Sequence, residues 1–225
     1  MSRPFHAVRA FRAHRQPIVL ATRNPGKVRE IREVLGELPV RVAGLDETAA
    51  VADPVEDGAT FAENARGKAL HYARACGGWC LADDSGLEVD ALAGRPGVRS
   101  ARYAAESFPP QADRPARDAA NNRKLLAALA DVPDERRTAR FVCHLVLADP
   151  DGVLIEACDA VEGLIAREPR GSNGFGYDPL FNIPELGCTA AELPAREKNR
   201  ISHRGKALRR FAGALRELLA ETGGA

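Results

Sequence analysis

The chain has 225 residues, of which 45% are hydrophobic and 28% are charged, and its formal net charge at pH 7 is +1. This length and hydrophobic content suffice for one large α/β domain, or two small lobes, with a buried core. The near-neutral charge argues against a general nucleic-acid binder, which needs a clear excess of lysine and arginine on one face. No apolar run approaches the roughly 20 residues of a transmembrane helix, so no membrane partner is expected.

Residues 1–16 differ in composition from the rest of the chain, because they contain four arginines and no acidic residue. Transit peptides share this composition, but we favour a disordered extension or a start codon placed too early in the gene. We therefore leave this segment out of the fold and assign residues 17–222 to a single domain. The five cysteines are dispersed, odd in number and without a C-x-x-C motif, which favours a reduced, cytoplasmic protein over a disulfide framework.

The first predicted unit is a strand, a turn and a helix. An apolar run at residues 18–21 precedes the polar residues 22–27, and apolar residues then recur at helical spacing. Asn24 suits the N-cap and Pro25 the first helical position, which places Lys27 in the first turn, beside the N–H groups that bind anions. The alternative is an ordinary capped helix with a solvated lysine.

A second strand is predicted at residues 40–43, followed by an acidic, irregular segment at residues 46–57. Thr60 and Glu63 then form a capping-box pattern that opens a long helix with one apolar stripe. Glu63 is therefore assigned to the cap. Glu56, just before the helix, is less easily explained by structure and stays a candidate ligand, with an exposed loop carboxylate as the alternative.

Two adjacent carboxylates, Asp83 and Asp84, follow the apolar residues 79–81 and precede Ser85 and Gly86. Side chains that succeed one another on a strand point to opposite faces, so both aspartates serve one site only if the chain has begun to turn. Serine and glycine favour such a turn. A turn at this place is where α/β enzymes hold metals and activate water, and the alternative is an Asx turn that closes a strand.

Residues 87–92 are next predicted as a strand, residues 94–103 as an arginine-bearing loop and residues 104–118 as a polar excursion. A helix is predicted at residues 121–129, and two antiparallel strands at residues 137–147 and 153–166. The antiparallel pair makes the sheet mixed rather than purely parallel. The predicted fold class is therefore α/β, with a central mixed β-sheet and flanking helices.

Residues 171–178 form a glycine-rich loop, in which Phe175 or Tyr177 is suited to stack on a base and Asp178 to accept from its N–H groups. An ordinary connector is the alternative. The spacing of glycines in the chain fits neither a P-loop nor a dinucleotide-binding fingerprint.

The last predicted element is a helix at residues 195–221, whose beginning carries Lys198, Arg200, His203 and Arg204 within two turns. A solvated charged face is the alternative. Together with the lysine-bearing helix start, the acidic segment and the glycine-rich loop, these residues suggest an enzyme that acts on a phosphorylated, Mg²⁺-bound substrate.

Six motifs in order resemble the inosine triphosphate pyrophosphatase family over about residues 17–220; they begin at Thr22, Phe61, Ala82, Ser100, Gly174 and Ile201. The resemblance implies a central sheet that floors an active-site cleft between two lobes, a homodimer and a requirement for Mg²⁺. It also implies hydrolysis of noncanonical purine nucleoside triphosphates (ITP, dITP and XTP) to the monophosphate and pyrophosphate.

Matched by motif, Asp84 resembles the catalytic carboxylate, which binds Mg²⁺ and accepts a proton, and Ser85 resembles a substrate contact beside it. Glu56 matches the second metal carboxylate, and we expect Asp83 to complete the metal site or anchor the turn. The implied substrate-binding residues are Thr22, Arg23, Asn24, Pro25, Gly26 and Lys27 at the phosphates, Phe175, Gly176, Tyr177 and Asp178 around the purine, and Lys198, His203 and Arg204 between them. Arg23 stands where many relatives have glycine.

Three other functions stay open at this point. One is a pyrophosphatase for other modified or pyrimidine nucleotides. Another is a non-catalytic nucleotide sensor, which the joint presence of Asp84 and Lys27 disfavours. The third is a nucleic-acid repair or binding protein, which the net charge and the absence of interleaved aromatic and basic residues disfavour.

Overall fold

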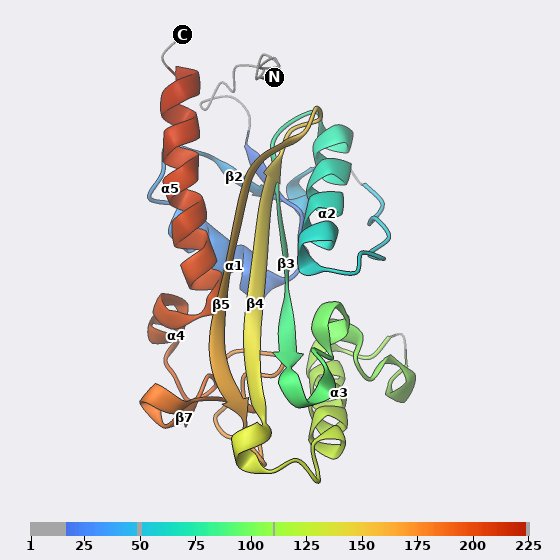
Figure 1. The fold of residues 1–225 in the computed structure, drawn as a ribbon. Coiled ribbons are helices and arrows are strands. Elements are labelled where there is room, and N and C mark those ends of the chain that lie inside the picture. The colour runs from blue at the N-terminus through green and yellow to red at the C-terminus, as the bar shows by residue number, and fades with distance from the viewer. Residues whose placement is uncertain (1–16, 49–50, 110, 224–225) are drawn as a thin grey trace, which may run out of the picture.

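The structure is a computed structural model that describes residues 17–48, 51–109 and 111–223. In these residues the strands form one mixed sheet with the order β2-β1-β3-β4-β5-β6-β7 (Figure 1). β1 pairs in parallel with β2 and β3, and the remaining neighbours are antiparallel. The strands are β1 Ile18–Leu20, β2 Val42–Gly44, β3 Cys80–Val89, β4 Thr138–Ala148, β5 Val153–Ile165, β6 Phe181–Ile183 and β7 Cys188–Thr189. The predicted mixed α/β sheet is confirmed.

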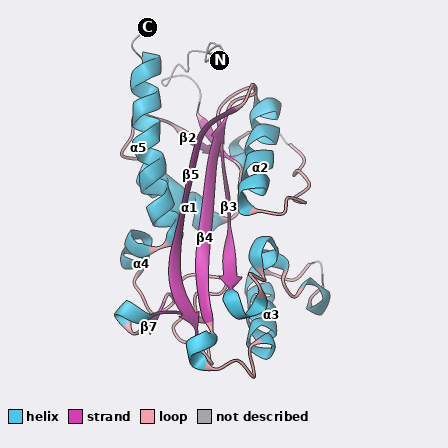
Figure 2. Ribbon diagram, viewed as in Figure 1, coloured by secondary structure: helices cyan, strands magenta, loops and turns pink. Residues whose placement is uncertain are grey.

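Helices lie on both sides of the long strands (Figure 2). α1 and α5 pack against one face of the sheet and α2 against the other, while α3 lies beyond the end of α2 (Figure 1). The helices are α1 Pro25–Leu35, α2 Phe61–Cys76, α3 Arg114–Ala128, α4 Ala195–Ile201 and α5 His203–Gly223. In the described part of the chain, no helix is both long and apolar enough to cross a membrane.

The two faces of the sheet carry side chains of different size, because alternate residues of a strand point to opposite faces. On the face of α1 and α5, Leu20, Leu81 and Leu145 pack against helix residues such as Phe211. On the face of α2, small residues such as Ala82 meet the alanine stripe of the helix. Small side chains allow α2 to approach the sheet closely. In the first half of β3, odd-numbered residues therefore face α1 and α5, and even-numbered residues face α2.

A third core lies farther along β3 and includes Leu87 and Val89, Leu125 of α3 and Phe181 of β6. The polar residues 83–86 of β3 are thus placed between cores that cover the strand on either side of them. This gap in the apolar packing is where the candidate site lies.

The predicted turn at residues 83–86 is wrong, because β3 continues without interruption from Cys80 to Val89. Each residue of this strand is paired with β4, and Asp84 lies opposite His144. Gly86 is required for close approach rather than for a turn: a Cβ there would lie 2.3 Å from the Ser100 hydroxyl and 2.9 Å from the Phe61 ring. Sheet pairing has overridden the local turn preference of these residues.

The predicted single helix at residues 195–221 is divided into α4 and α5 at Ser202, whose backbone is extended with ψ at 155°. The Ser202 hydroxyl accepts a hydrogen bond from the Gly205 amide at 3.0 Å and so caps the start of α5. The two helices approach closely here, since a Cβ on Gly205 would lie 1.7 Å from the Asn199 carbonyl oxygen. His203 and Arg204 therefore begin a new helix.

Smaller differences concern element limits. β2 begins two residues later than predicted, α3 begins seven residues earlier, and β6 and β7 were not predicted. The helical start of α3 replaces part of the polar excursion expected at residues 104–118. All five cysteines lie in the described residues and are free thiols there. The assignments for residues 1–16 lie outside the described residues, and the two-lobed domain at 17–222 stays a prediction.

Candidate functional site

A cavity of about 660 Å³ opens at an edge of β3. β1 pairs with β3 only at Cys80 and Leu81, and it ends at Leu20. Among the described residues, no strand covers this edge from Asp83 to Gly86. The cavity therefore reaches β3 from both faces of the sheet, and residues of α1, α2, α3, α4 and α5 all contribute to its lining.

The turn before α1 has the predicted cap. The Asn24 side chain accepts from the amides of Gly26 and Lys27, at 3.0 and 3.4 Å, and Pro25 is the first helical residue. Thr22 supports the turn by accepting from the Asn24 amide at 3.2 Å. These bonds direct the first turn of α1, and with it the Lys27 side chain, toward the edge of β3.

Lys27 is not the solvated lysine of the alternative interpretation, because its side chain is only 15% exposed. Its ammonium lies 2.5 Å from Asp83 Oδ1 and 3.3 Å from the Asp83 carbonyl oxygen. Arg23, on the same turn, instead points outward and contacts Asp53 at 3.3 Å. The turn thus contributes one cation to the edge of β3 and one to the rim of the cavity.

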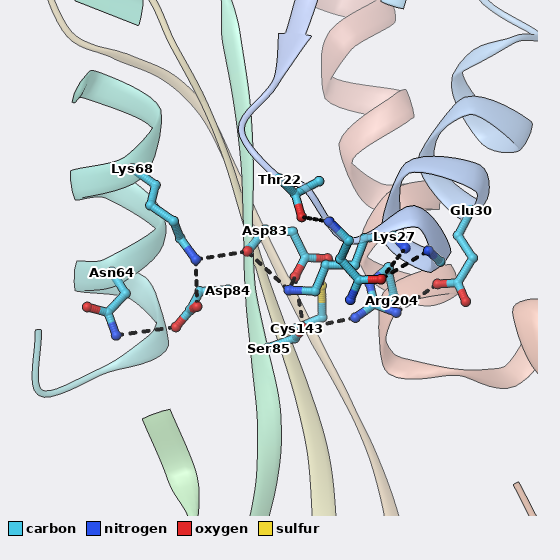
Figure 3. A network of polar contacts seen from close by, with 12 residues as sticks. Thr22, Lys27, Glu30, Asn64, Lys68, Asp83, Asp84, Ser85, Cys143 and Arg204 are labelled. Atoms are coloured by element: carbon cyan, nitrogen blue, oxygen red, sulfur yellow. Dashed lines mark hydrogen bonds and ion pairs between the residues drawn. The ribbon is translucent and has the colours of Figure 1, made fainter. Parts of the chain in front are cut away.

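On the face of α1 and α5, Asp83 is completely surrounded by donors (Figure 3). Besides Lys27, it accepts from Arg204 Nε at 2.7 Å, from the Ser85 hydroxyl at 2.8 Å and from the Cys143 thiol at 3.6 Å. Burial opposes ionisation, but the charges of Arg204 and Lys27 outweigh it and hold the pKa of Asp83 well below its ordinary value. Asp83 is therefore an ionised, structural carboxylate.

Arg204 joins this network to α1. Its guanidinium also donates to Glu30 at 2.7 Å and to the Ser85 hydroxyl at 2.9 Å. Burial disfavours the charged form, but the carboxylates of Asp83 and Glu30 outweigh it and raise the pKa of Arg204. Two buried anions thus hold the arginine in place at the start of α5.

His203 is buried next to Arg204 and stacks on Phe141, with the ring centroids 4.9 Å apart. Burial, followed by the charge of Arg204, keeps the pKa of His203 well below its ordinary value. The imidazole is accordingly neutral at physiological pH. A neutral ring both donates and accepts one hydrogen bond, as recognition of a base edge requires.

On the face of α2, Asp84 has a different environment (Figure 3). Lys68 Nζ lies 2.7 Å from Oδ1, and the Asn64 amide donates to Oδ2 at 3.4 Å. Burial raises the pKa of Asp84 above its ordinary value, and although Lys68 opposes this shift, Glu56 adds to it. Of the two aspartates, Asp84 is therefore the one whose pKa is shifted upward, toward neutral pH.

Glu56 shares Lys68 with Asp84, since its carboxylate lies 3.1 Å from the same ammonium. Burial would lower the pKa of Lys68, but the two carboxylates outweigh it and raise that pKa, so the lysine is charged. Arg102 approaches Glu56 from the other side at 3.6 Å. Two carboxylates and two cations therefore form the wall of the cavity on this face.

Lys68 and Arg102 are not among the predicted site residues. One signal for Lys68 was present, because Asn64 and Lys68 lie one turn apart beside the apolar stripe of α2. A lysine at the buried edge of a helix needs an anionic partner. Arg102 lies in the motif that begins at Ser100, but its loop contains several arginines and the sequence does not single it out.

The glycine-rich loop also lines the cavity. Asp178 is buried and accepts from the Phe175 amide at 2.7 Å and from Lys198 Nζ at 2.5 Å. Gly174 has a φ of 76°, and a Cβ there would lie 2.1 Å from Asp178 Oδ2, so only glycine fits. The loop is thus tied to α4 and holds Phe175 at the cavity.

The two aromatic residues of this loop are not equivalent. Phe175 is ringed by cations, with Lys198 Nζ 4.9 Å and Arg204 Cζ 5.7 Å from its centroid. Tyr177 is only 4% exposed, and its hydroxyl donates to the Ser100 carbonyl at 2.9 Å. Phe175 is therefore the aromatic surface that the cavity offers to a ligand, whereas Tyr177 supports the loop from below.

The carboxylates that line the cavity do not form a metal site composed of protein ligands alone. Among the described residues, no group of three or more His, Cys, Asp or Glu side chains is placed to hold a metal ion. Asp83 lies on the opposite face of β3 from Asp84, with both oxygens bonded to cations. Asp84 and Glu56, joined by Lys68, are the pair of carboxylates that face the cavity together.

The chain matches the model of the Ham1 family over residues 18–214. It is 50% identical to a dITP/XTP pyrophosphatase of Desulforamulus reducens over 201 residues, which cover 89% of this chain and 96% of that protein. It is 54% identical to a dITP/XTP pyrophosphatase of Nitratidesulfovibrio vulgaris over 194 residues, which cover 86% and 93%.

Solved structures agree with this assignment. A HAM1 protein from Coxiella burnetii is 44% identical and superposes with a TM-score of 0.80, covering 89% of this chain and 98% of that one. The Staphylococcus aureus Ham1 protein is 38% identical, with a TM-score of 0.78 and coverage of 90% and 100%. On sequence and fold together, the chain belongs to the Ham1 family.

Proposed function

We propose that this protein hydrolyses noncanonical purine nucleoside triphosphates, dITP, ITP and XTP, to the monophosphate and pyrophosphate. The observation that carries the proposal is the pair of lysines, Lys27 and Lys68, that meet at the edge of β3 beside the carboxylate of Asp84. The aromatic ring of Phe175 lines the same cavity, so phosphate-binding and base-binding surfaces face one space. Similarity to the dITP/XTP pyrophosphatases of other bacteria supports the same activity.

Cations at the edge of β3 are suited to the phosphates. A nucleoside triphosphate carries about four negative charges near neutral pH, and cleavage between the α and β phosphates adds charge to the departing pyrophosphate. Lys27 and Lys68 hold their ammonium groups at the strand edge through carboxylates on opposite faces. Because these groups are already in place, the transition state is stabilised without a large rearrangement.

The residues at the cavity also fit Mg²⁺. This ion is commonly held by one or two carboxylates, with substrate phosphates and water completing the shell. Asp84 and Glu56 would be those carboxylates, and Asp83 is better assigned to ordering Lys27 and Arg204. When bound, Mg²⁺ neutralises phosphate charge and lowers the pKa of coordinated water.

Asp84 is assigned as the general base. Its pKa is raised by burial, which makes the carboxylate a better proton acceptor than an ordinary aspartate. It orients a water molecule for in-line attack at the α phosphorus and accepts its proton. The new bond joins water oxygen to the α phosphorus, the bond from that phosphorus to the bridging oxygen breaks, and pyrophosphate leaves.

Recognition of the base is assigned to the part of the cavity around Phe175. This ring offers a stacking surface, Lys198 and Arg204 lie over it as hydrogen-bond donors, and His203 lines the same cavity. Hypoxanthine and xanthine carry a keto oxygen at position 6, where adenine carries an amino group. A donor that meets the amino group stays unpaired, at a cost of about 1–3 kcal/mol, which disfavours adenine nucleotides.

We also propose a homodimer in the cytoplasm. The dispersed free thiols suit a reducing compartment, and the family resemblance implies two copies. Light scattering on the purified full chain tests the oligomeric state, and a monomer at micromolar concentration would refute it.

The activity is tested by measuring pyrophosphate and orthophosphate released from dITP, XTP, dGTP, dATP and dCTP, with Mg²⁺ and with a chelator. We expect Mg²⁺-dependent pyrophosphate from dITP and XTP, and loss of this product in Asp84→Asn with the fold retained. Orthophosphate as product would move the cut to the terminal phosphate and refute the mechanism. Turnover of dCTP would favour a broader pyrophosphatase, and tight binding without product a nucleotide sensor.

A further inference from the structure

Arg114 is a cavity residue that none of the motifs includes. It is the first residue of α3, whose N-cap Asp113 accepts from the Ala116 amide at 2.9 Å. Its guanidinium carbon lies 4.3 Å from the centroid of the Phe175 ring, closer than the charged atoms of Lys198 or Arg204. A planar guanidinium at this distance stacks on an aromatic face.

α3 holds the loop of Phe175 at three successive turns. Asp118 accepts from the Gly176 amide at 2.8 Å, and Asn122 donates to the Gly176 carbonyl at 3.0 Å. Arg114, Asp118 and Asn122 are spaced by four residues, so they share one face of the helix. Because both backbone groups of Gly176 are bonded to α3, the positions of Arg114 and Phe175 are fixed relative to each other.

The guanidinium of Arg114 is held less closely by carboxylates than the charged groups of Lys198 and Arg204 are. Lys198 and Arg204 are bonded to the buried carboxylates of Asp178 and Asp83. Arg114 approaches Asp118 only at 3.6 Å, and its side chain is 40% exposed. It is therefore free to change conformation while the other two cations stay in place.

We infer that Arg114 and Phe175 form two walls of a slot for the nucleobase, with the guanidinium plane stacked on the base face that Phe175 does not cover. This inference rests on the proposed function. The spacing of 4.3 Å accommodates a single stacking contact, so the base enters as the Arg114 side chain swings outward and then closes over it. Base-aromatic stacking and arginine stacking both tolerate different bases, so the slot adds affinity rather than discrimination.

Contact with the base explains the placement of Arg114 better than contact with phosphate. The cations assigned to phosphate, Lys27 and Lys68, are bonded to the strand edge at Asp83. Arg114 instead comes from the helix that anchors the loop of the aromatic ring, and its contact is with the ring itself. Its planar group is matched to a planar ligand.

The test compares Arg114→Ala, Arg114→Lys and Arg114→Tyr with wild type, and uses Arg123→Ala as the control, since Arg123 is an exposed arginine of the same helix outside the cavity lining. We expect Arg114→Ala to raise KM about tenfold for dITP and XTP alike, with kcat unchanged. Arg114→Tyr, which retains a stacking plane without charge, is expected to restore KM more than Arg114→Lys. Inhibition by inorganic tripolyphosphate is expected to be the same in all variants.

Three results would overturn the inference: an unchanged KM in Arg114→Ala, rescue by lysine but not by tyrosine, or weaker inhibition by tripolyphosphate in Arg114→Ala. The last two would assign Arg114 to phosphate. Calorimetric binding of dIMP to wild type and Arg114→Ala separates this inference from the proposed function. If the wild type turned over no dITP but bound dIMP more tightly than Arg114→Ala, the function would fail and the slot would stand.

Discussion

Lys27 and Lys68 donate to the same acceptor, the carbonyl oxygen of Asp83, at 3.3 and 3.2 Å. They come from α1 and α2, which lie on opposite faces of the sheet (Figure 3). Each lysine also pairs with the aspartate on its own face, Lys27 with Asp83 and Lys68 with Asp84. The edge of β3 beyond the end of β1 thus brings together cations that the sheet would otherwise separate, and it gives the two adjacent aspartates different roles.

The structural role of Asp83 predicts that Asp83→Asn strongly destabilises the fold. The amide retains the shape but leaves the buried charges of Lys27 and Arg204 without their anion. Breaking a buried pair in this way costs about 3–5 kcal/mol, and urea unfolding measures the loss. Asp84→Asn is the matched control. Its loss should be smaller because Glu56 still pairs with Lys68, and equal losses would contradict this division of roles.

The pH dependence of turnover should report Asp84. The acid limb of kcat/KM follows the pKa of the base in the free enzyme, and burial raises that pKa above its ordinary value. Activity is therefore lost as pH falls and Asp84 takes up a proton. Lys68 lowers the pKa of Asp84, so Lys68→Met should move the limb to higher pH. If the acid limb of Lys68→Met lies at the same pH as that of the wild type, with both measured at saturating Mg²⁺, another group accepts the proton.

Because of His203, the free energy of unfolding should decrease as pH falls below the ordinary pKa of histidine. Burial, and then the charge of Arg204, hold its pKa well below the ordinary 6.5, so the folded imidazole stays neutral while the unfolded one gains a proton. The unfolded state binds more protons below pH 6.5, so the free energy of unfolding drops by up to about 1.4 kcal/mol per pH unit. Urea unfolding at pH 7, 6 and 5 measures this slope. His203→Asn, although less stable overall, should have a flatter profile over that range.

Gly86 and Gly67 should respond in opposite directions to replacement by alanine. A Cβ at Gly86 would lie 2.3 Å from the Ser100 hydroxyl, 2.9 Å from the Gly97 carbonyl oxygen and 2.9 Å from the Phe61 ring. The Gly97 carbonyl belongs to the backbone and cannot move aside as the end of a flexible side chain can. Overpacking of this kind costs about 1–3 kcal/mol. At Gly67, inside α2, no atom of the described residues lies within 4 Å of a Cβ, so alanine should stabilise by about 0.5–1 kcal/mol. A tolerated Gly86→Ala would contradict the close packing of β3 against residues 97–100.

Elements with local signals could be predicted from the sequence. Asn24 and Thr60 cap their helices through hydrogen bonds to amides two or three residues away. Alternation along β4 and the turn at residues 149–152 indicated the antiparallel pair, and Asp149 closes that turn by accepting from the amides of Asp151 and Gly152. In each case the stabilising interactions lie within a few residues, or repeat with the period of the element.

Other features depend on partners far along the chain. The residues around Gly86 have turn-forming character, yet pairing with β4 keeps them extended, and no local pattern reveals that pairing. Lys68 belongs to the site because Asp84 and Glu56 reach it from two other segments. Arg114 joins the cavity because Gly176 is bonded to its helix.

The sequence by itself determined the class of the fold, the caps that start α1 and α2, and the residue types that suit a phosphorylated substrate, since these follow from composition, period and local hydrogen bonds. The tertiary structure alone decided which charges meet. Residues that are adjacent in a strand face opposite ways, so Asp83 and Asp84 were separated by the pleat. Lys27 and Lys68 were brought together because β1 ends early and leaves the edge of β3 open to both helices.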